Sequence, residues 1–223
     1  MKKKLAVGGF IKLLSGLLLL GLLLFVPAGT IHYPGAWRMI CVLFIPMFVL
    51  GVVLLIANPK LLEKRLNQKE SEPEQKVVIF FSSLLFVACF LLCGFDFRYE
   101  WTSVPMWLSI VGCIVFLATY AGFAELLREN EYLSRTVKVQ EGQKVVSTRM
   151  YGIVRHPMYA IIFWMFLSMP IIIGSFAGLI PMVLLPFILV KRIKNEERVL
   201  KSELEGYEEY TRKVRYRLIP FIW

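Results

Sequence analysis

Four long apolar stretches, each with at most one charged residue, constrain this chain more than any other feature of its sequence. A helix needs roughly 20 apolar residues to cross a bilayer, and inside the bilayer every backbone polar group must be satisfied within the protein. Each stretch has about this length, so the sequence predicts an all-α, polytopic integral-membrane bundle. The stretches are Leu5–Val26, Ala36–Ala57, Val77–Phe95 and Val104–Leu127.

The first stretch has two interpretations. Lys2, Lys3 and Lys4 precede it and small residues near Ala28 follow it, which is also typical of a signal peptide. The leucine-rich run is longer than the apolar core of such a signal. We therefore interpret it as a retained first span.

A fifth apolar region, Met158–Val190, is too long for one span and too short for two. A tight helical hairpin with arms Met158–Ile173 and Phe176–Val190 fits this length. We expect the second arm to continue as an amphipathic helix through Glu205. The residues that interrupt the region are Pro170, Gly174 and Gly178.

The basic residues indicate how the chain is oriented in the membrane. All but two of the 26 Lys and Arg residues fall in the tail before residue 13 and in segments 58–76, 128–157 and 191–223. The exceptions, Arg38 and Arg98, are expected in loops on the opposite side, as is the sole aspartate, Asp96. Positive charge marks the cytoplasmic side, so we expect both termini and the active site to face the cytoplasm, in the plasma membrane of a prokaryote.

The net charge of +10 is accordingly interpreted as a topology signal and not as a surface for nucleic acid. Membrane lipids with anionic headgroups are the partners that it favours. The polar segment 67–76 is expected to be a solvated connector. The chain is expected to form a single integral-membrane domain over residues 1–223, with spans in 1–127 and a loop, hairpin and C-terminal segment in 128–223.

The four cysteines lie within apolar stretches. Cys89 and Cys93 would share one helix face, but no histidine or carboxylate joins them at the spacing of metal ligands. We expect buried core residues and no metal site. The other two are Cys41 and Cys113.

Ionisable and aromatic side chains gather beside the hairpin, between Val139 and Tyr216. In the segment RHPMY, Pro157 restricts His156 to an extended conformation and suits the first turn of a helix. The unpaired N–H groups of that turn favour an anionic or carbonyl-rich ligand, with Arg155 and His156 as further donors. An interfacial basic pair followed by an anchoring tyrosine explains this motif equally well.

A second motif, RIKNEE, places Arg192 and Glu196 four residues apart on one helix face near the membrane boundary. By itself it is best explained as an ordinary ion pair on a solvated helix.

Taken together, the RHPxY motif, a hairpin of about 30 residues, RxxxEE, a YxxY pair and a terminal proline resemble the isoprenylcysteine carboxyl methyltransferase family and its prokaryotic integral-membrane relatives. The resemblance is strong from Gln140 to Pro220. It implies a methyltransferase that uses S-adenosyl-L-methionine. It also implies that Arg192 holds a methyl-accepting carboxylate, that Arg192 and Glu196 are the catalytic residues, and that Tyr207 and Tyr210 close the site. The cofactor-binding residues that it implies are Gln140, Gln143, Lys144, Val145, Val146, Tyr151, His156, Pro157, Met158, Tyr159 and Glu196.

Two positions depart from the family pattern. A glycine usually precedes the tyrosine of the loop, where this chain reads STRM before Tyr151. A small residue usually follows HPxY by two positions, where this chain has Ile161. Both departures bear on the shape of the pocket, so the identity of the acceptor stays open.

The residues fit a carboxylate acceptor best. A carboxylate is ionised at neutral pH, so it needs orientation, which an arginine gives through two parallel hydrogen bonds. An amine acceptor would need a base, for which Glu196 and His156 are candidates. We therefore expect a lipophilic or lipidated carboxylate, such as an isoprenylcysteine, as the substrate.

Three alternatives stay open at this point. One is an N-methyltransferase that acts on a phospholipid or another amine. A second is an NADPH-dependent enzyme like the sterol reductases, which have a related C-terminal half but are larger. The third is a transporter or scaffold with a basic end, although the chain lacks the repeated halves that transporters usually show. The sequence leaves the oligomeric state open.

Overall fold

A computed structural model of the chain describes residues 2–66, 73–130, 132–133 and 139–223, and in these ranges all regular structure is helical. The first five helices are α1 (Lys2–Ala28), α2 (Pro34–Ala57), α3 (Pro59–Leu66), α4 (Pro73–Tyr99) and α5 (Met106–Glu129). They are followed by the 3-10 turn η1 (Arg149–Gly152), α6 (Pro157–Ile173), α7 (Leu179–Met182), α8 (Leu185–Glu203) and α9 (Tyr207–Lys213).

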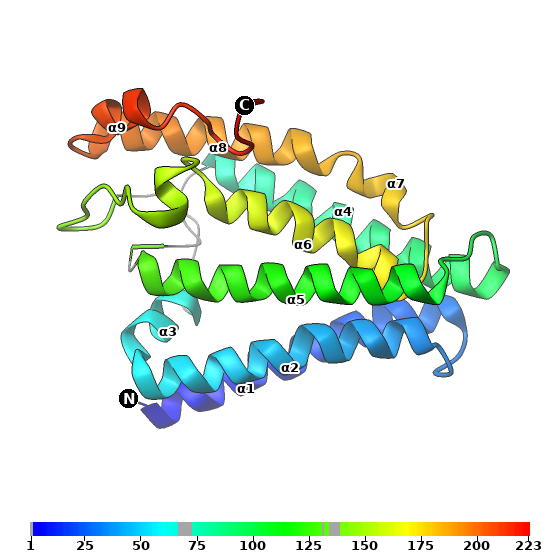
Figure 1. Cartoon of the computed structure of the whole chain (residues 1–223). Helices are drawn as coiled ribbons and strands as arrows, with labels where there is room; N and C mark the ends of the chain where they lie inside the picture. Colours follow the sequence, from blue (N-terminus) through cyan, green and yellow to red (C-terminus); the bar gives the residue numbers. More distant parts are fainter. Residues whose placement is uncertain (1, 67–72, 131, 134–138) are drawn as a thin grey trace.

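The long helices run roughly parallel or antiparallel to one another and form a bundle (Figure 1). The pair α1 and α2 forms one side, α5 packs along α6, and α4 lies against α1 and α8. Buried side chains from these helices form one core, in which Leu24, Met39, Phe116 and Ile172 are fully enclosed. The polar loop after α5, the charged half of α8, and α9 all lie at the end of the bundle where α1 begins.

The outer surface of the bundle is apolar. Large side chains such as Leu22, Ile56, Phe80 and Trp107 are exposed on it, and a soluble monomer does not show so much exposed apolar surface. Four helices, α1, α2, α4 and α5, are long and apolar enough to cross a membrane. The prediction of four spans in a polytopic helical membrane bundle is confirmed.

The connector between the second and third spans differs from the prediction. Residues 67–72 lie outside the described residues, but Pro59–Leu66 forms α3 and Pro73–Lys76 begins α4. Gln75 is fully buried and Lys76 is exposed, so the described end of the segment belongs to a helix and is solvated only in part. A proline suits the first turn of a helix, and one stands at each of these two starts, Pro59 and Pro73.

The first arm of the expected hairpin is confirmed as α6, which ends at Ile173 and is followed by Gly174 with a left-handed φ of 100°. The prediction of a continuous second arm over Phe176–Val190 is wrong, because this region is divided into α7 and α8. Pro186 has no N–H to donate to the preceding turn, and the chain instead makes tight turns such as Leu184 N–H to Pro181 O at 3.1 Å. The amphipathic extension is present and ends at Glu203, two residues earlier than expected.

The charged residues at the far end lie in helices and not in loops, as Arg38 belongs to α2 and Asp96 to α4. Asp96 is buried and accepts hydrogen bonds from Thr102 N (2.7 Å), Thr102 Oγ1 (2.6 Å) and Ser175 Oγ. Arg38 donates to Ile172 O (3.3 Å) near the last turn of α6, where a cation is favoured. These contacts fix the turn after α6 to the rest of the bundle.

Candidate functional site

A pocket opens at the charged end of the bundle, where segments from the last two fifths of the chain meet. It contains about 790 Å³ of empty space, a volume that includes space open to solvent. Ten of the residues that the family resemblance implies line it: Gln143, Lys144, Val145, Val146, Tyr151, His156, Pro157, Met158, Tyr159 and Glu196. The remaining lining residues are Asn130, Tyr132, Leu133, Arg155, Leu200, Leu204, Tyr207 and Tyr210.

Helices α6 and α8 meet at this pocket through one chain of hydrogen bonds. The Tyr159 hydroxyl donates to Glu196 Oε2 at 2.6 Å, and Arg192 Nε donates to the same hydroxyl oxygen at 2.9 Å. Arg192 and Glu196 therefore share a helix face, as their spacing indicates, and Tyr159 lies between them. Glu196 lines the pocket, whereas Arg192 lies outside its lining.

A second carboxylate, Glu197, holds a buried cationic cluster beside the pocket. Its Oε1 lies 2.8 Å from Arg155 Nε and 3.3 Å from His156 Nε2, and its Oε2 accepts from Arg217 Nε at 2.8 Å. Burial alone would raise the pKa of Glu197, but the hydrogen bonds from His156 and Arg217 and the charge of Arg155 outweigh it and lower the pKa to about 2. Glu197 is therefore ionised at neutral pH and balances the cations around it.

The sequence reasoning missed Glu197, although a signal for it exists. Ile193 and Glu197 are four apart, and both are buried on the inner face of α8. A carboxylate on the same face as a core isoleucine needs cationic partners. The partners that it has in the structure are the basic residues of RHPMY and Arg217 of the C-terminal segment.

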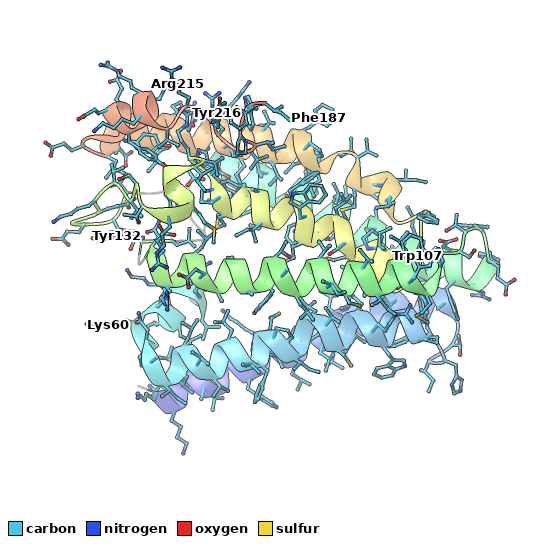
Figure 2. The ribbon with its side chains drawn as sticks, in the orientation of Figure 1. Lys60, Trp107, Tyr132, Phe187, Arg215 and Tyr216 are labelled. Carbon is cyan, nitrogen blue, oxygen red and sulfur yellow. The ribbon has the colours of Figure 1, made fainter. Side chains whose placement is uncertain are left out.

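The C-terminal segment is bonded across the start of α6. Arg155 N donates to Tyr216 O and His156 N to Arg217 O, each at 2.9 Å. The Tyr210 hydroxyl donates to Tyr151 O at 2.7 Å. Figure 2 shows Tyr216 and Arg215 at the end of the bundle that also holds Tyr132 and Lys60, whereas Trp107 lies toward the other end. This segment thus forms part of the wall of the site.

Gln140 lies beside the pocket and not in its lining. Its side chain donates to Tyr132 O (2.6 Å) and accepts from Lys64 of α3 (2.9 Å), and its backbone N–H donates to Gln143 Oε1 (2.9 Å). Gln140 therefore braces the loop that carries Gln143 and its neighbours. The contact with Lys64, 76 residues earlier, had no signal in the sequence.

The tyrosines around the pocket remain neutral donors. Burial raises the pKa of Tyr151 to about 12, against a lowering effect of its hydrogen bond from Asn130. Burial also raises the pKa of Tyr207 and of Tyr210. Near neutral pH the pocket therefore carries protonated tyrosine hydroxyls near the ionised carboxylate of Glu197.

Two protein families match parts of the chain. The model of the isoprenylcysteine carboxyl methyltransferase family matches residues 110–202, which contain η1, α6, α7, most of α5 and α8, and all ten of the lining residues expected from the resemblance. The model of the vacuolar protein sorting 55 family matches residues 11–131, which contain most of α1 and all of α2 to α5 and end before the loop that carries Gln143. The comparison with curated proteins finds no match. Most of the residues that line the pocket thus lie within the match to the first family, which supports assigning the chain to the isoprenylcysteine carboxyl methyltransferase family.

Proposed function

We propose that the protein is an integral-membrane methyltransferase that uses S-adenosyl-L-methionine to methylate the carboxylate of a lipophilic acceptor, such as an isoprenylcysteine. The observation that carries the proposal is the Arg192–Tyr159–Glu196 chain of hydrogen bonds. It joins a cation that suits a carboxylate to the wall of the pocket. The family match supports a membrane methyltransferase in general, and the acceptor and cofactor are the parts that we propose.

The chemistry of the pocket wall fits this cofactor. Bound there, S-adenosylmethionine would supply a methyl group on a positively charged sulfur. Glu196 offers a carboxylate to the positive charge, and Lys144 offers a cation to the carboxylate of the amino-acid end. Val145 and Leu200 belong to an apolar part of the wall that suits a purine ring.

The residues of the acceptor side bind and orient and do not need to remove a proton. A carboxylate acceptor is ionised near neutral pH, and a guanidinium orients it through parallel hydrogen bonds. Holding the reactants in line accounts for several kcal/mol of a barrier, up to about 7–11 kcal/mol in the best intramolecular cases. The role that we assign to Arg192 is this orientation.

The outer surface of α7 and α8 suits the lipophilic part of the acceptor. Val183, Leu184 and Phe187 are exposed on it, Phe187 at 70%, and Figure 2 shows Phe187 on α8, farther from the charged end of the bundle than Tyr216. These residues precede Arg192 on the same chain segment. An acceptor whose tail lies in the bilayer beside them would reach Arg192 with its carboxylate.

The placement of charge supports the orientation that we propose in the cell. The pocket lies at the end that gathers the Lys and Arg residues of the loops and the C-terminal segment. By the positive-inside rule this end would face the cytoplasm, in the plasma membrane of a prokaryote, where a water-soluble cofactor has access.

Calorimetric binding to the detergent-purified protein with added lipid tests the cofactor. We expect the protein to bind S-adenosylmethionine and not NADPH, and Glu196→Gln to weaken that binding. Glu203→Gln is the matched control, because Glu203 is exposed on the same helix two turns later. If the folded protein binds NADPH and not S-adenosylmethionine, the proposal is wrong and a reductase is favoured.

Transfer of a labelled methyl group tests the acceptor. We expect label on an N-acylated, S-prenylated cysteine with a free carboxylate, and none on its carboxamide. Label on phosphatidylethanolamine in place of the carboxylate would mean that the enzyme methylates amines.

A further inference from the structure

The hydroxyl of Tyr207 is a buried polar group without a hydrogen-bond partner among the described residues. Tyr207 is only 4% exposed and lines the pocket. A hydroxyl buried without a partner costs about 1–3 kcal/mol, so native proteins provide partners for nearly all such groups. The position of this one beside a ligand pocket suggests that its partner is the ligand.

Tyr210 provides a contrast three residues later on α9. It is buried to the same degree and also lines the pocket, but its hydroxyl donates to Tyr151 O at 2.7 Å. Tyr210 is therefore a structural link between α9 and η1. The hydroxyls of the two tyrosines in the YxxY pair therefore differ in hydrogen bonding, although the family resemblance implies the same role for both, that of closing the site.

The surroundings of Tyr207 indicate which part of the cofactor it meets. The apolar cluster to which Tyr207 belongs contains Leu204 and Tyr210, with Val145 and Leu200 packed against it. All four of these residues also line the pocket. The charges of Glu197 and Glu196 also act on its hydroxyl. Tyr207 thus belongs to the apolar wall that suits a purine and lies within reach of the charge of the carboxylate that suits the sulfonium.

We propose that the Tyr207 hydroxyl hydrogen-bonds the adenosine half of bound S-adenosylmethionine, and that Tyr210 only fixes α9 in place. The inference rests on the proposed function, since it assumes that this cofactor occupies the pocket. Ribose and purine both carry acceptors and donors that a neutral tyrosine hydroxyl can meet. The pocket then gains from the bound cofactor a hydrogen bond that the free protein does not make.

The test compares Tyr207→Phe with Tyr210→Phe in the full-length protein, by thermal unfolding without ligand and by calorimetric binding. Tyr207→Phe removes a hydroxyl without a partner, so the ligand-free protein should be at least as stable as the wild type. Its affinity for S-adenosylmethionine should fall about three- to tenfold, as for the loss of one uncharged hydrogen bond. Tyr210→Phe leaves Tyr151 O without its donor, so it should lower the unfolding temperature of the ligand-free protein, which Tyr207→Phe should not do.

Displacement of labelled S-adenosylhomocysteine by 5′-methylthioadenosine, which lacks the amino-acid end, locates the contact. Tyr207→Phe should weaken this fragment by the same factor as the whole cofactor. Equal affinities of wild type and Tyr207→Phe for the cofactor would overturn the inference, and a loss for the cofactor alone would overturn the adenosine assignment. A wild-type protein that binds no S-adenosylmethionine would instead overturn the proposed function itself.

Discussion

Replacing Glu197 by glutamine tests the buried cluster beside the pocket. Glu197 is 4% exposed, and its pKa of about 2 lies below its ordinary value of 4.5. A difference of one pKa unit corresponds to about 1.4 kcal/mol, so the ionised carboxylate contributes about 3 kcal/mol to the free energy of unfolding at neutral pH. Glutamine keeps the shape but leaves the charges of Arg155 and Arg217 without a counter-charge, so a loss of at least this size is expected.

The sign of the pH dependence follows from the direction of the shift. A carboxylate whose pKa is lowered by folding stabilises the protein above its unfolded pKa, and the contribution is lost as the pH falls from about 4.5 to about 2. The stability difference between wild type and Glu197→Gln should therefore be constant near neutral pH. It should then shrink through this acid range.

Unfolding titrations with SDS in mixed micelles, repeated at several pH values, measure this difference. Glu209→Gln is the matched control, because Glu209 is exposed and pairs with Lys213 on the surface of α9. It should leave the free energy of unfolding unchanged within error. If Glu197→Gln is as stable as the wild type at neutral pH, or if the difference does not depend on pH below 4.5, the reasoning about the cluster is refuted.

Three further predictions follow from the geometry. Arg192→Lys should lower kcat/KM for a carboxylate acceptor about tenfold or more, because lysine cannot form the two parallel hydrogen bonds that arginine forms with a carboxylate. The Kd for S-adenosylmethionine should stay within twofold of the wild-type value, and a parallel loss of cofactor affinity would contradict this prediction. Asp96→Asn should lower the free energy of unfolding by about 1–3 kcal/mol, since one of its donors such as the Ser175 hydroxyl loses a charged acceptor, and calorimetry should show unchanged cofactor binding at the distant pocket. Gly35→Ala should lower the yield of folded protein in size-exclusion chromatography, because its new methyl group would overlap the backbone oxygen of Ile173, whereas Gly51→Ala, which meets open space, should not.

The spans could be predicted from the sequence because their signal is local. A stretch of roughly twenty apolar residues favours a membrane-spanning α-helix, because a helix satisfies its own backbone polar groups in a bilayer. Each predicted span overlaps a helix of the structure. The division of the second hairpin arm was harder to foresee, because it depends on which turn a proline such as Pro186 interrupts. Buried Asp96 accepts a hydrogen bond from Ser175, which lies 79 residues away in the sequence. A local sequence pattern cannot predict a contact between residues so far apart.

The candidate site shows the same division between local and distant information. The face shared by Arg192 and Glu196 follows from helical spacing, and the structure keeps it. Two other contacts depend on how α6, α8 and the last residues of the chain pack together. One is the position of Tyr159 between Arg192 and Glu196, and the other is the hydrogen bond from Arg217 to Glu197. Helical periodicity predicts which residues of one helix share a face, but it does not predict which side chains of the neighbouring element will contact that face.

The α6–α8 hairpin has a consequence for the biosynthesis of the protein. One half of the pocket wall, from Asn130 to Tyr159, ends in the first turn of α6, and the other half, from Glu196 to Tyr210, begins in the second half of α8. The two halves meet because α6 leads away from this end of the bundle and α7 and α8 lead back to it. A nascent chain whose hairpin stays outside the membrane, or crosses it only once, would keep its four spans and yet have no assembled pocket, so ligand binding would report on the last step of membrane insertion.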